Sequence, residues 1–525
     1  MEKKETVTNS CGRILPKYIE GYGEIRPFLG AFETGPIEEN EMRIVTGFQK
    51  PGGEKLVGTI KEALEKSGIK DGMTISFHHH LREGDEVVNM AIKAIRELGI
   101  KNLKLAPSAL FETHKMILES LKDGTIRQIE GSMNGSVGRA TSEGKLSSVA
   151  VLRSHGGRVR AIRQGDLKID IAIIAAPTAD PYGNANGLYG KNACGPLAYS
   201  HADSLYAKKV IIVTDNLVKY PAIPVSISQI NVDYVVVVDS IGDNTKIVSG
   251  TTTIQSNPIS EKISKFATDV VEHSGYFKEG FSLQAGAGGI SLSVVKSLGE
   301  LMEAKGIKAA WANGGTTRYV IDLFKKGLIE KVSTCQAFDL VSVQSMKEDP
   351  LHLETNIDFY ANPFNKGCLV NLLDVVILGA TEVDVNFNVN VNTHSDGYLL
   401  HGIGGHQDTA ACAKLTIITV PISRKTNPII VDDVTTITTP GECIDVVVTD
   451  VGVAINPKRK DLIENLSKTD IPLFTIEQLR DKAAELAGRS YVKPKTTDRI
   501  IGIVQWRDGT VIDVVYQVDT NKDEK

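Results

Sequence analysis

The chain repeats one pattern of strands and helices about halfway along its length. Four segments of the first half recur in the second half in the same order, displaced by 208, 204, 205 and 212 residues. The pairs are KDGMTISFHHH (70–80) with KEGFSLQAGAG (278–288), DIAIIAAPTAD (170–180) with DVVILGATEVD (374–384), KKVIIVT (208–214) with AKLTIIT (413–419), and VDYVVVVD (232–239) with IDVVVTD (444–450). One such pair means little because all buried strands are alike, but four in order indicate a duplicated α/β domain.

The repeat predicts the fold class. Segments such as VIIVTD (210–215) and LTIITV (415–420) are apolar on both faces, as buried parallel strands are, and amphipathic helical segments lie between them. A chain of 525 residues is also too long for one ordinary core. We therefore predict an α/β protein with two similar domains, each a mostly parallel sheet flanked by helices. The predicted limits are an N-terminal extension at 1–40, domains at 41–265 and 266–518, and a polar tail at 519–525.

Net charge and cysteine usage exclude several classes of protein. The formal net charge of −5 argues against a nucleic-acid surface, which needs a basic face. The six cysteines are scattered singly with no C-x-x-C pair, so we expect reduced thiols and no zinc, iron–sulfur or disulfide framework. The first residues lack the apolar core of a signal peptide, and no run reaches the ~18 apolar residues of a membrane helix. We therefore predict a cytoplasmic protein that spans no membrane.

Glycines fill the first strand-to-helix turn of the second half, SLQAGAGGISLS (282–293). Gly286, Gly288 and Gly289 let backbone N–H groups approach an anion at the start of a helix. A nicotinamide dinucleotide would also require an acidic residue at the end of the next strand. That strand ends AAWANGG (309–315) without Asp or Glu, so dinucleotide binding is disfavoured.

The equivalent turn of the first half, FHHHLREGD (77–85), carries three histidines and an arginine. His78 and His80 could share a metal ion, whereas His79 points to the opposite face of an extended chain. No cysteine or second histidine pair lies near them in the sequence. With Arg82 adjacent, a pocket for carboxylates is the better interpretation, and we predict no metal.

Two further segments combine glycine with charged residues. RSHGGRVRAIRQG (153–165) places Arg153, Arg158, Arg160 and Arg163 around a glycine pair, and it is either a solvated basic loop or part of an anion site. ADPYGNANG (179–187) follows a buried strand, at the edge of the sheet where α/β proteins collect ligands.

The stretch HSDGYLLHGIGGHQDTAA (394–411) follows a buried strand of the second half in the same manner. Its glycines, Gly402, Gly404 and Gly405, could offer backbone N–H groups to a reacting carbonyl. His406 and Asp408 beside them could serve as acid–base or orienting groups.

Together these motifs resemble the coenzyme A transferase superfamily and, within it, the alpha chains of citrate lyase. The motifs are IEGYGEIRPFLGAF (19–32), FHHHLREGDEVV (77–88), RSHGGRVRAI (153–162), DPYGNANG (180–187), SGYFKEGFSLQAGAGG (274–289), GGTTRYVIDLF (314–324) and SDGYLLHGIGGHQDTA (395–410). The resemblance runs from about residue 12 to about residue 515.

The resemblance implies a reaction: citrate plus acetyl–acyl-carrier-protein gives citryl–acyl-carrier-protein plus acetate. It also implies an oligomeric complex, in which a beta chain cleaves the citryl thioester and a gamma chain, the acyl carrier protein, carries a coenzyme A-like arm. The chain itself would bind no cofactor and would act on that arm. Many coenzyme A transferases carry a nucleophilic Glu after the strand that corresponds to IKAAWANGG, but positions 309–313 hold no carboxylate. A mixed anhydride formed by citrate is therefore expected, without a glutamyl thioester.

On this interpretation the candidate residues divide into three groups. The catalytic group is Gly404, Gly405, His406 and Asp408; the citrate-binding group is His78, His79, His80, Arg82, Arg153, His155 and Arg158; and the group facing the carrier arm is Gly286, Gly288, Gly289, Gly314, Gly315, Thr316, Thr317 and Gly402. Two alternatives are a generic coenzyme A transferase with a covalent Glu, with Glu382 as its candidate, and a non-catalytic subunit that binds metabolites.

Overall fold

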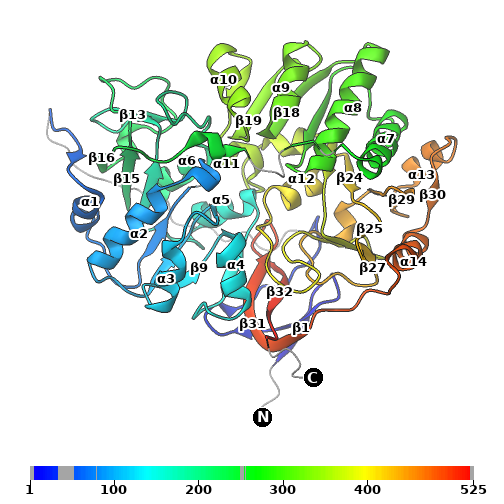
Figure 1. The fold of residues 1–525 in the computed structure, drawn as a ribbon, viewed down its shortest axis with the longest axis horizontal. Coiled ribbons are helices and arrows are strands. Elements are labelled where there is room, and N and C mark those ends of the chain that lie inside the picture. Colours follow the sequence, from blue (N-terminus) through cyan, green and yellow to red (C-terminus); the bar gives the residue numbers. More distant parts are fainter. Residues whose placement is uncertain (1–4, 34–51, 79, 249–252, 255, 521–525) are drawn as a thin grey trace.

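Two large sheets form the two halves of the molecule, which lie side by side (Figure 1). The computed structural model describes residues 5–33, 52–78, 80–248, 253–254 and 256–520. The first sheet has the strand order β5 (Leu56–Val57), β16 (Tyr234–Val237), β15 (Lys209–Thr214), β12 (Ile171–Ala175), β6 (Thr74–Ser76), β7 (Leu103–Leu105) and β9 (Ile126–Ile129). The second has the order β20 (His352–Glu354), β19 (Val332–Ala337), β18 (Ala309–Thr316), β17 (Phe281–Ala285), β21 (Val375–Leu378), β24 (Leu415–Thr419), β28 (Val446–Val448), β29 (Val453–Ile455) and β30 (Leu473–Phe474).

The two sheets share one topology, which confirms the predicted pair of α/β units. Strands β9-β7-β6-β12-β15-β16 of the first sheet correspond in order to β19-β18-β17-β21-β24-β28 of the second. All pairings in the first sheet are parallel, and the second departs from this only where β28 meets β29. Parallel strands with helical crossovers bury both faces, which is why these segments are apolar throughout.

The strand pairing corrects one step of the predicted repeat. Lys209 pairs with Ile171 in the first sheet, and Leu415 pairs with Val375 in the second. The offset of β15 and β24 is therefore 206 residues, one more than the match of KKVIIVT with AKLTIIT predicts. A one-residue slip is easy to make because all positions of a doubly buried strand are apolar.

Helices cover the sheets of both halves (Figure 1). Those of the first half are α1 (Ile60–Lys66), α2 (Val87–Glu97), α3 (Met116–Lys122), α4 (Gly135–Ser142), α5 (His155–Gln164) and α6 (Ala198–Tyr206). Those of the second are α7 (Pro258–His273), α8 (Gly289–Lys305), α9 (Arg318–Lys325), α10 (Leu340–Glu348), α11 (Ile357–Ala361), α12 (His406–Cys412), α13 (Lys460–Leu466) and α14 (Ile476–Ala487). The Asn257 side chain accepts from Ser260 N and caps α7, and Pro258 is its first residue. The predicted limit at 265/266 thus falls inside a continuous helix that packs in the core of the second half.

The end of the chain returns to the first half. Strands β31 (Thr496–Gln505) and β32 (Val511–Val518) form a sheet with β11 (Ala150–Leu152). The N-terminal segment packs on the same hairpin, where Phe28 N donates to Val511 O at 3.0 Å and Asn9 Nδ2 donates to Ile512 O at 2.7 Å. In Figure 1 these first and last segments of the chain lie together below the junction of the halves.

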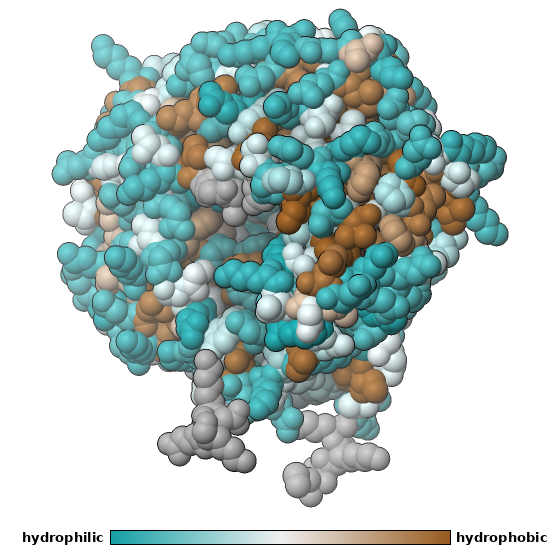
Figure 2. All heavy atoms as spheres, turned by 45° about the vertical axis from the view of Figure 1, so that its right-hand side comes forward, coloured by the Kyte–Doolittle hydropathy of each residue, from teal (hydrophilic) through white to brown (hydrophobic). Residues whose placement is uncertain are grey.

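One buried cluster continues from the first half into the second. It includes Tyr199 and Ile212 of the first half and Tyr360 and Ile418 of the second. Helix α11 of the second half packs against α5 and α6 of the first. The outer face shown in Figure 2 is mostly hydrophilic, with hydrophobic residues gathered on its right-hand side. Within the described residues, no helix is both long and apolar enough to cross a membrane.

Candidate active site at the junction of the halves

Five aromatic side chains form a row across the junction, which we call the ring row: His80, His78, Tyr199, His155 and Tyr360. The ring centroids of His80 and His78 are 5.7 Å apart, and those of His78 and Tyr199 are 6.4 Å apart. The row continues from Tyr199 to His155 at 5.0 Å and from His155 to Tyr360 at 6.5 Å. Three predicted residues, His78, His80 and His155, are thus brought together, although 75 positions separate His80 from His155.

The histidines of the first turn are held by helix α6. His78 Nε2 lies 3.3 Å from Asp203 Oδ2, and His80 Nε2 lies 3.1 Å from Ser200 Oγ. Both side chains are buried. Burial and the neighbouring His78 lower the pKa of His80 to about 3, so its ring is neutral at neutral pH. Each of the two histidines thus has one neighbour on α6, and the absence of a metal stays a prediction; His79 lies outside the described residues.

Arg158 has its charge neutralised inside the protein. Its guanidinium donates to both oxygens of Asp203, at 2.8 and 2.9 Å, and to Ala106 O at 2.8 Å. Burial opposes ionisation of Asp203, but Arg158 and His78 outweigh it and hold the pKa of that carboxyl well below its usual value. The predicted contact of Arg158 with citrate stays a prediction that this bidentate pair does not favour.

His155 stands at the first position of α5 and faces the second half. Ser154 caps the helix by accepting from Gly157 N, and His155 N donates to Gly404 O at 2.9 Å. Tyr199 Oη is hydrogen-bonded to His155 Nδ1. Burial, with Arg158 nearby, lowers the pKa of His155 to about 3, so its ring is also neutral. Unlike His78 and His80, His155 keeps part of its surface exposed.

Gly404 and Gly405 lie against the ring row. A Cβ at Gly404 would stand 3.8 Å from His155 Nε2, and the backbone there has a φ of +65°, which favours glycine. A Cβ at Gly405 would stand 2.7 Å from Tyr360 Oη, too close for any side chain. Tyr360 Oη in turn accepts from Gln284 Nε2 at 2.7 Å. The structure therefore places this predicted glycine pair beside two hydrogen-bonding side chains.

His406 is bonded at both ring nitrogens. Nδ1 lies 2.8 Å from Thr439 Oγ1, and Nε2 lies 3.1 Å from Gly379 O. The side chain is buried, and burial lowers its pKa to about 4. A general base needs a nitrogen that can reach substrate. The predicted catalytic role of His406 stays a prediction that this geometry does not favour.

Asp408 ties the two halves together. Its Oδ1 accepts from Ser154 Oγ at 3.0 Å and its Oδ2 accepts from Gly156 N at 2.9 Å, so the carboxylate of the second half caps helix α5 of the first. Arg507 Nε lies 3.4 Å from Oδ1. Asp408 has no exposed surface, and burial raises its pKa. We interpret it as an anchor rather than an acid–base group.

Arg153 and Arg82 differ in their surroundings. Arg153 donates to Gln505 Oε1 at 2.6 Å and to Glu130 Oε2 at 2.5 Å, so its charge is used internally. Arg82 has a φ of +53°, which is rare for a residue with a side chain and is often found at functional sites. Its guanidinium lies 5.4 Å from the Phe111 ring centroid and 5.0 Å from that of Phe338. The Arg82 guanidinium is therefore packed against two aromatic rings, and its predicted contact with citrate stays a prediction.

The glycines assigned to the carrier arm serve close packing in several places. A Cβ at Gly314 would meet Gln284 Nε2 at 2.6 Å, one at Gly315 would meet Phe338 at 2.1 Å, and one at Gly402 would meet Ser132 at 2.5 Å. Thr316 Oγ1 bonds Thr334 Oγ1 at 2.9 Å inside the second half. The remaining predicted residues stand at helix starts: Gly288 and Gly289 at α8, next to Gly286, and Thr317 at α9.

Tyr199, Tyr360 and Gln284 were not predicted from the sequence. The repeat held a signal for Tyr199. With the structural offset of 206 residues, Tyr199 of α6 corresponds to Gly405, which precedes α12. Gly405 was a predicted site residue, so its equivalent in the first half could have been examined as well. Gln284 lies inside the quoted segment SLQAGAGGISLS (282–293), where only the glycines were singled out, and Tyr360 lies outside every quoted motif.

The segment ADPYGNANG forms a closed turn. Asp180 Oδ1 accepts from Gly183 N at 2.9 Å, and Asn184 Nδ2 donates to Asp180 Oδ2 at 2.8 Å. The second half repeats the turn, where Asp384 Oδ1 accepts from Asn388 N at 2.9 Å. The polar side chains of both segments stabilise the turn itself.

Glu382, the candidate nucleophile of the alternative hypothesis, is fully buried. Its Oε2 accepts from Asn390 Nδ2 at 3.0 Å and from Thr435 N at 2.8 Å, and its Oε1 accepts from Thr435 Oγ1 at 3.1 Å. A carboxylate nucleophile needs an oxygen that substrate can reach. Glu382 offers none.

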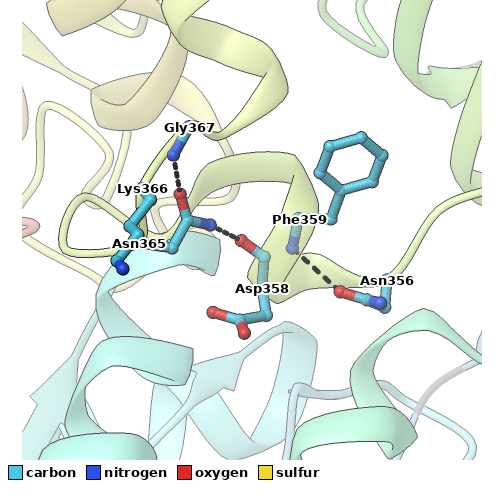
Figure 3. A pocket seen from close by; sticks show the side chains of 6 residues that line it. All are labelled: Asn356, Asp358, Phe359, Asn365, Lys366 and Gly367. Atoms are coloured by element: carbon cyan, nitrogen blue, oxygen red, sulfur yellow. Dashed lines mark hydrogen bonds between the residues drawn. The ribbon is translucent and has the colours of Figure 1, made fainter.

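A shallow pocket of about 460 Å³ opens beside α11 (Figure 3). It is lined by Asn356, Asp358, Phe359, Asn365, Lys366 and Gly367. Its polar groups bond one another, as where Phe359 N donates to Asn356 Oδ1 at 2.8 Å and Gly367 N donates to Asn365 Oδ1 at 2.9 Å. It holds none of the predicted residues, and we place the site at the ring row because the predicted histidines and glycines meet there.

Comparison with known proteins decides the family. A sequence profile of the family described as citrate lyase, alpha subunit, matches residues 53–518. The chain belongs to the citrate lyase alpha subunit family. The citrate lyase alpha chain of Haemophilus influenzae is 47% identical over 468 residues, which cover 88% of this chain and 93% of that one. The citrate lyase alpha chain of Escherichia coli is 43% identical over 492 residues, 93% of this chain and 95% of that one.

Solved structures agree with this membership of the citrate lyase alpha subunit family. The putative alpha subunit of citrate lyase from Streptococcus mutans, solved in complex with citrate, superposes with a TM-score of 0.93 at 44% identity, covering 97% of this chain and 99% of that one. The alpha subunit of a malonate decarboxylase from Acinetobacter baumannii has a TM-score of 0.62 at 16% identity, covers 84% of this chain and 91% of that one, and shares the fold alone.

Because the buried histidines are neutral in the folded protein, we expect the free energy of unfolding to fall in mild acid. Burial lowers the pKa of His80 to about 3 and of His406 to about 4, whereas the unfolded side chain titrates near ~6.5. The unfolded chain therefore binds more protons below that pH. The free energy of unfolding should fall by up to about 1.4 kcal/mol per pH unit for each histidine, from pH ~6.5 down to the pKa of the folded state.

Urea unfolding between pH 7 and 5 measures this slope. His406→Gln should reduce it, whereas His273→Gln, at an exposed position, should leave it unchanged. Equal slopes for the wild type and His406→Gln would show that His406 is protonated in the folded protein.

Proposed function

We propose that the chain transfers an acyl carrier thioester from acetate to citrate: citrate plus acetyl–acyl-carrier-protein gives citryl–acyl-carrier-protein plus acetate. Membership in the citrate lyase alpha subunit family carries the proposal, since the Streptococcus mutans relative was solved with citrate. The beta chain of the complex would cleave the citryl thioester. The gamma chain would supply the carrier and its coenzyme A-like arm, and this chain would hold no cofactor of its own.

The exchange proceeds through a ternary complex. A citrate carboxylate attacks the carbonyl carbon of the acetyl thioester, the C–S bond breaks, and an acetyl–citryl anhydride and a thiolate form. The thiolate then attacks the citryl carbonyl, the C–O bond to the acetyl group breaks, and acetate leaves. No net proton is consumed. Holding the reactants together can supply roughly 7–11 kcal/mol of the barrier.

The ring row and the glycine pair support this mechanism. His155 and Tyr360 place polar side-chain atoms beside Gly404 and Gly405, where a carbonyl could be held between the halves. Three buried carboxylates of the described residues already have protein partners: Asp203 is paired with Arg158, Asp408 caps helix α5, and Glu382 accepts from Asn390 and Thr435. Arg82 and the histidines of the first turn would face the anionic substrate.

The purified chain tests the proposal directly. With labelled citrate and acetylated carrier protein it should release acetate and form citryl thioester, and oxaloacetate should appear only after the beta chain is added. After the acetyl donor and then hydroxylamine, mass spectrometry should find every Glu unmodified, and Glu382→Gln should exchange acyl groups as before if the variant folds. A stoichiometric adduct on a Glu would favour a generic coenzyme A transferase. Absence of acetate release would favour the non-catalytic subunit.

A further inference from the structure

The two halves differ at one equivalent position of the site. Ala207 N donates to Asp203 O before β15, and Ala413 N donates to Thr409 O before β24, so the chain enters both strands in the same way. On this register Tyr199 of the first half corresponds to Gly405 of the second. The first half has a phenol side chain at this position, whereas the second half has a glycine. A Cβ at Gly405 would clash with Tyr360. The junction is therefore asymmetric about His155.

His155 stands between these two unlike positions. Its Nδ1 bonds Tyr199 Oη, and its Nε2 is directed toward Gly404, where a Cβ would lie 3.8 Å away. Within the described part of the chain, Nε2 has no hydrogen-bond partner, and His155 is partly exposed while Tyr199 is buried. The helix start also fixes the backbone, because His155 N donates to Gly404 O. The ring thus has one nitrogen held by the first half and one directed at the glycines of the second.

We propose that His155 Nε2–H donates a hydrogen bond to the oxygen of the reacting carbonyl above Gly404 and Gly405, and that Tyr199 is the positioning residue that holds the ring. The inference rests on the proposed acyl exchange and assigns His155 to the reacting carbonyl rather than to a remote carboxylate of citrate. In a neutral imidazole one nitrogen donates and the other accepts. When Tyr199 Oη–H donates to Nδ1, the single ring proton lies on Nε2. The donor is then available without protonation of the ring, and it faces charge that develops on the oxygen in each addition step.

Three variants of the full chain test the roles, assayed with acetylated carrier protein and citrate. His155→Phe should lower kcat by ~100–1000-fold, the usual effect of losing one oxyanion donor, while the KM for citrate changes little. Tyr199→Phe keeps the donor but frees the ring, and should lower kcat by roughly 10–100-fold, again at nearly constant KM. Tyr234→Phe is the matched control, because its hydroxyl bonds Lys66 O at an exposed place in the first half. A raised KM for citrate at unchanged kcat in His155→Phe would overturn the assignment.

The tautomer of the His155 ring is a second measurement. It should change in Tyr199→Phe if Tyr199 positions the ring, and it should not change if Tyr199 only stabilises the fold. In protein with ¹⁵N-labelled histidine rings, the His155 signals, assigned by their loss in His155→Phe, should show a protonated Nε2 and an unprotonated Nδ1. Tyr199→Phe should give a mixture. A protonated Nδ1 in the wild type would overturn the proposal even where Tyr199→Phe fails to fold. If the wild type exchanges no acyl groups, the proposed function fails, whereas the tautomer still reports whether Tyr199 donates to His155.

Discussion

Asp408→Ala is expected to lower the free energy of unfolding by about 3–5 kcal/mol, because removing one partner of a buried ion pair leaves the other charge unpaired. Arg507 would keep its charge in a buried place, and Gly156 N and Ser154 Oγ at the start of α5 would lose their acceptor. The junction of the halves would open at the same time, so we also expect the exchange activity to fall.

Urea unfolding of the full chain measures this loss. The matched control is Asp432→Ala, whose ion pair with Arg480 lies on the surface with 77% of the Asp432 side chain exposed. Surface pairs of this kind contribute about 0–1 kcal/mol. If both variants lose the same free energy of unfolding, Asp408 does not anchor the two halves.

Gly405→Ala is expected to lower the exchange rate by roughly 100-fold, since a shift of about 1 Å in a reacting group can have that effect. The new Cβ would stand 2.7 Å from Tyr360 Oη, and Tyr360 is buried and bonded to Gln284, so its ring cannot swing away freely. Either Tyr360 or the loop at Gly404 must move, and both adjoin His155.

Two further variants separate this clash from a general loss of stability. Gly367→Ala, where a Cβ meets nothing within 4 Å, should exchange acyl groups like the wild type. Gly405→Ala combined with Tyr360→Phe removes the clashing hydroxyl and should recover part of the rate, as a coupled pair does in a double-mutant cycle. Full activity in Gly405→Ala alone would show that Tyr360 and the glycine pair are not part of the site.

The periodicity of the chain was enough to predict the fold, and the turns that it marked supply part of the candidate site. Apolar runs without alternation indicate buried parallel strands, and their recurrence predicted two equivalent sheets, as found in β6-β12-β15 and β17-β21-β24. Ligand-facing turns collect at the carboxyl ends of such strands, so His78, His80 and the glycines at 404–405 could be expected to gather. The citrate lyase alpha subunit family was recognisable for the same reason, because its motifs occupy these turns.

The tertiary structure decided which partners the charged and polar residues have. Arg158 and His406 look like ligands in the sequence, but contacts 45 and 33 positions away satisfy them inside the protein. Asp408 caps a helix 252 positions earlier in the chain. The sequence gives the charge of a side chain but does not identify its partner. A buried polar group needs a hydrogen-bond or ion-pair partner, and the fold determines which residue that is. The contacts of Tyr199 and Tyr360 with the site, and the return of β31 to the first half, depend on the same long-range packing, which no local pattern of residues encodes.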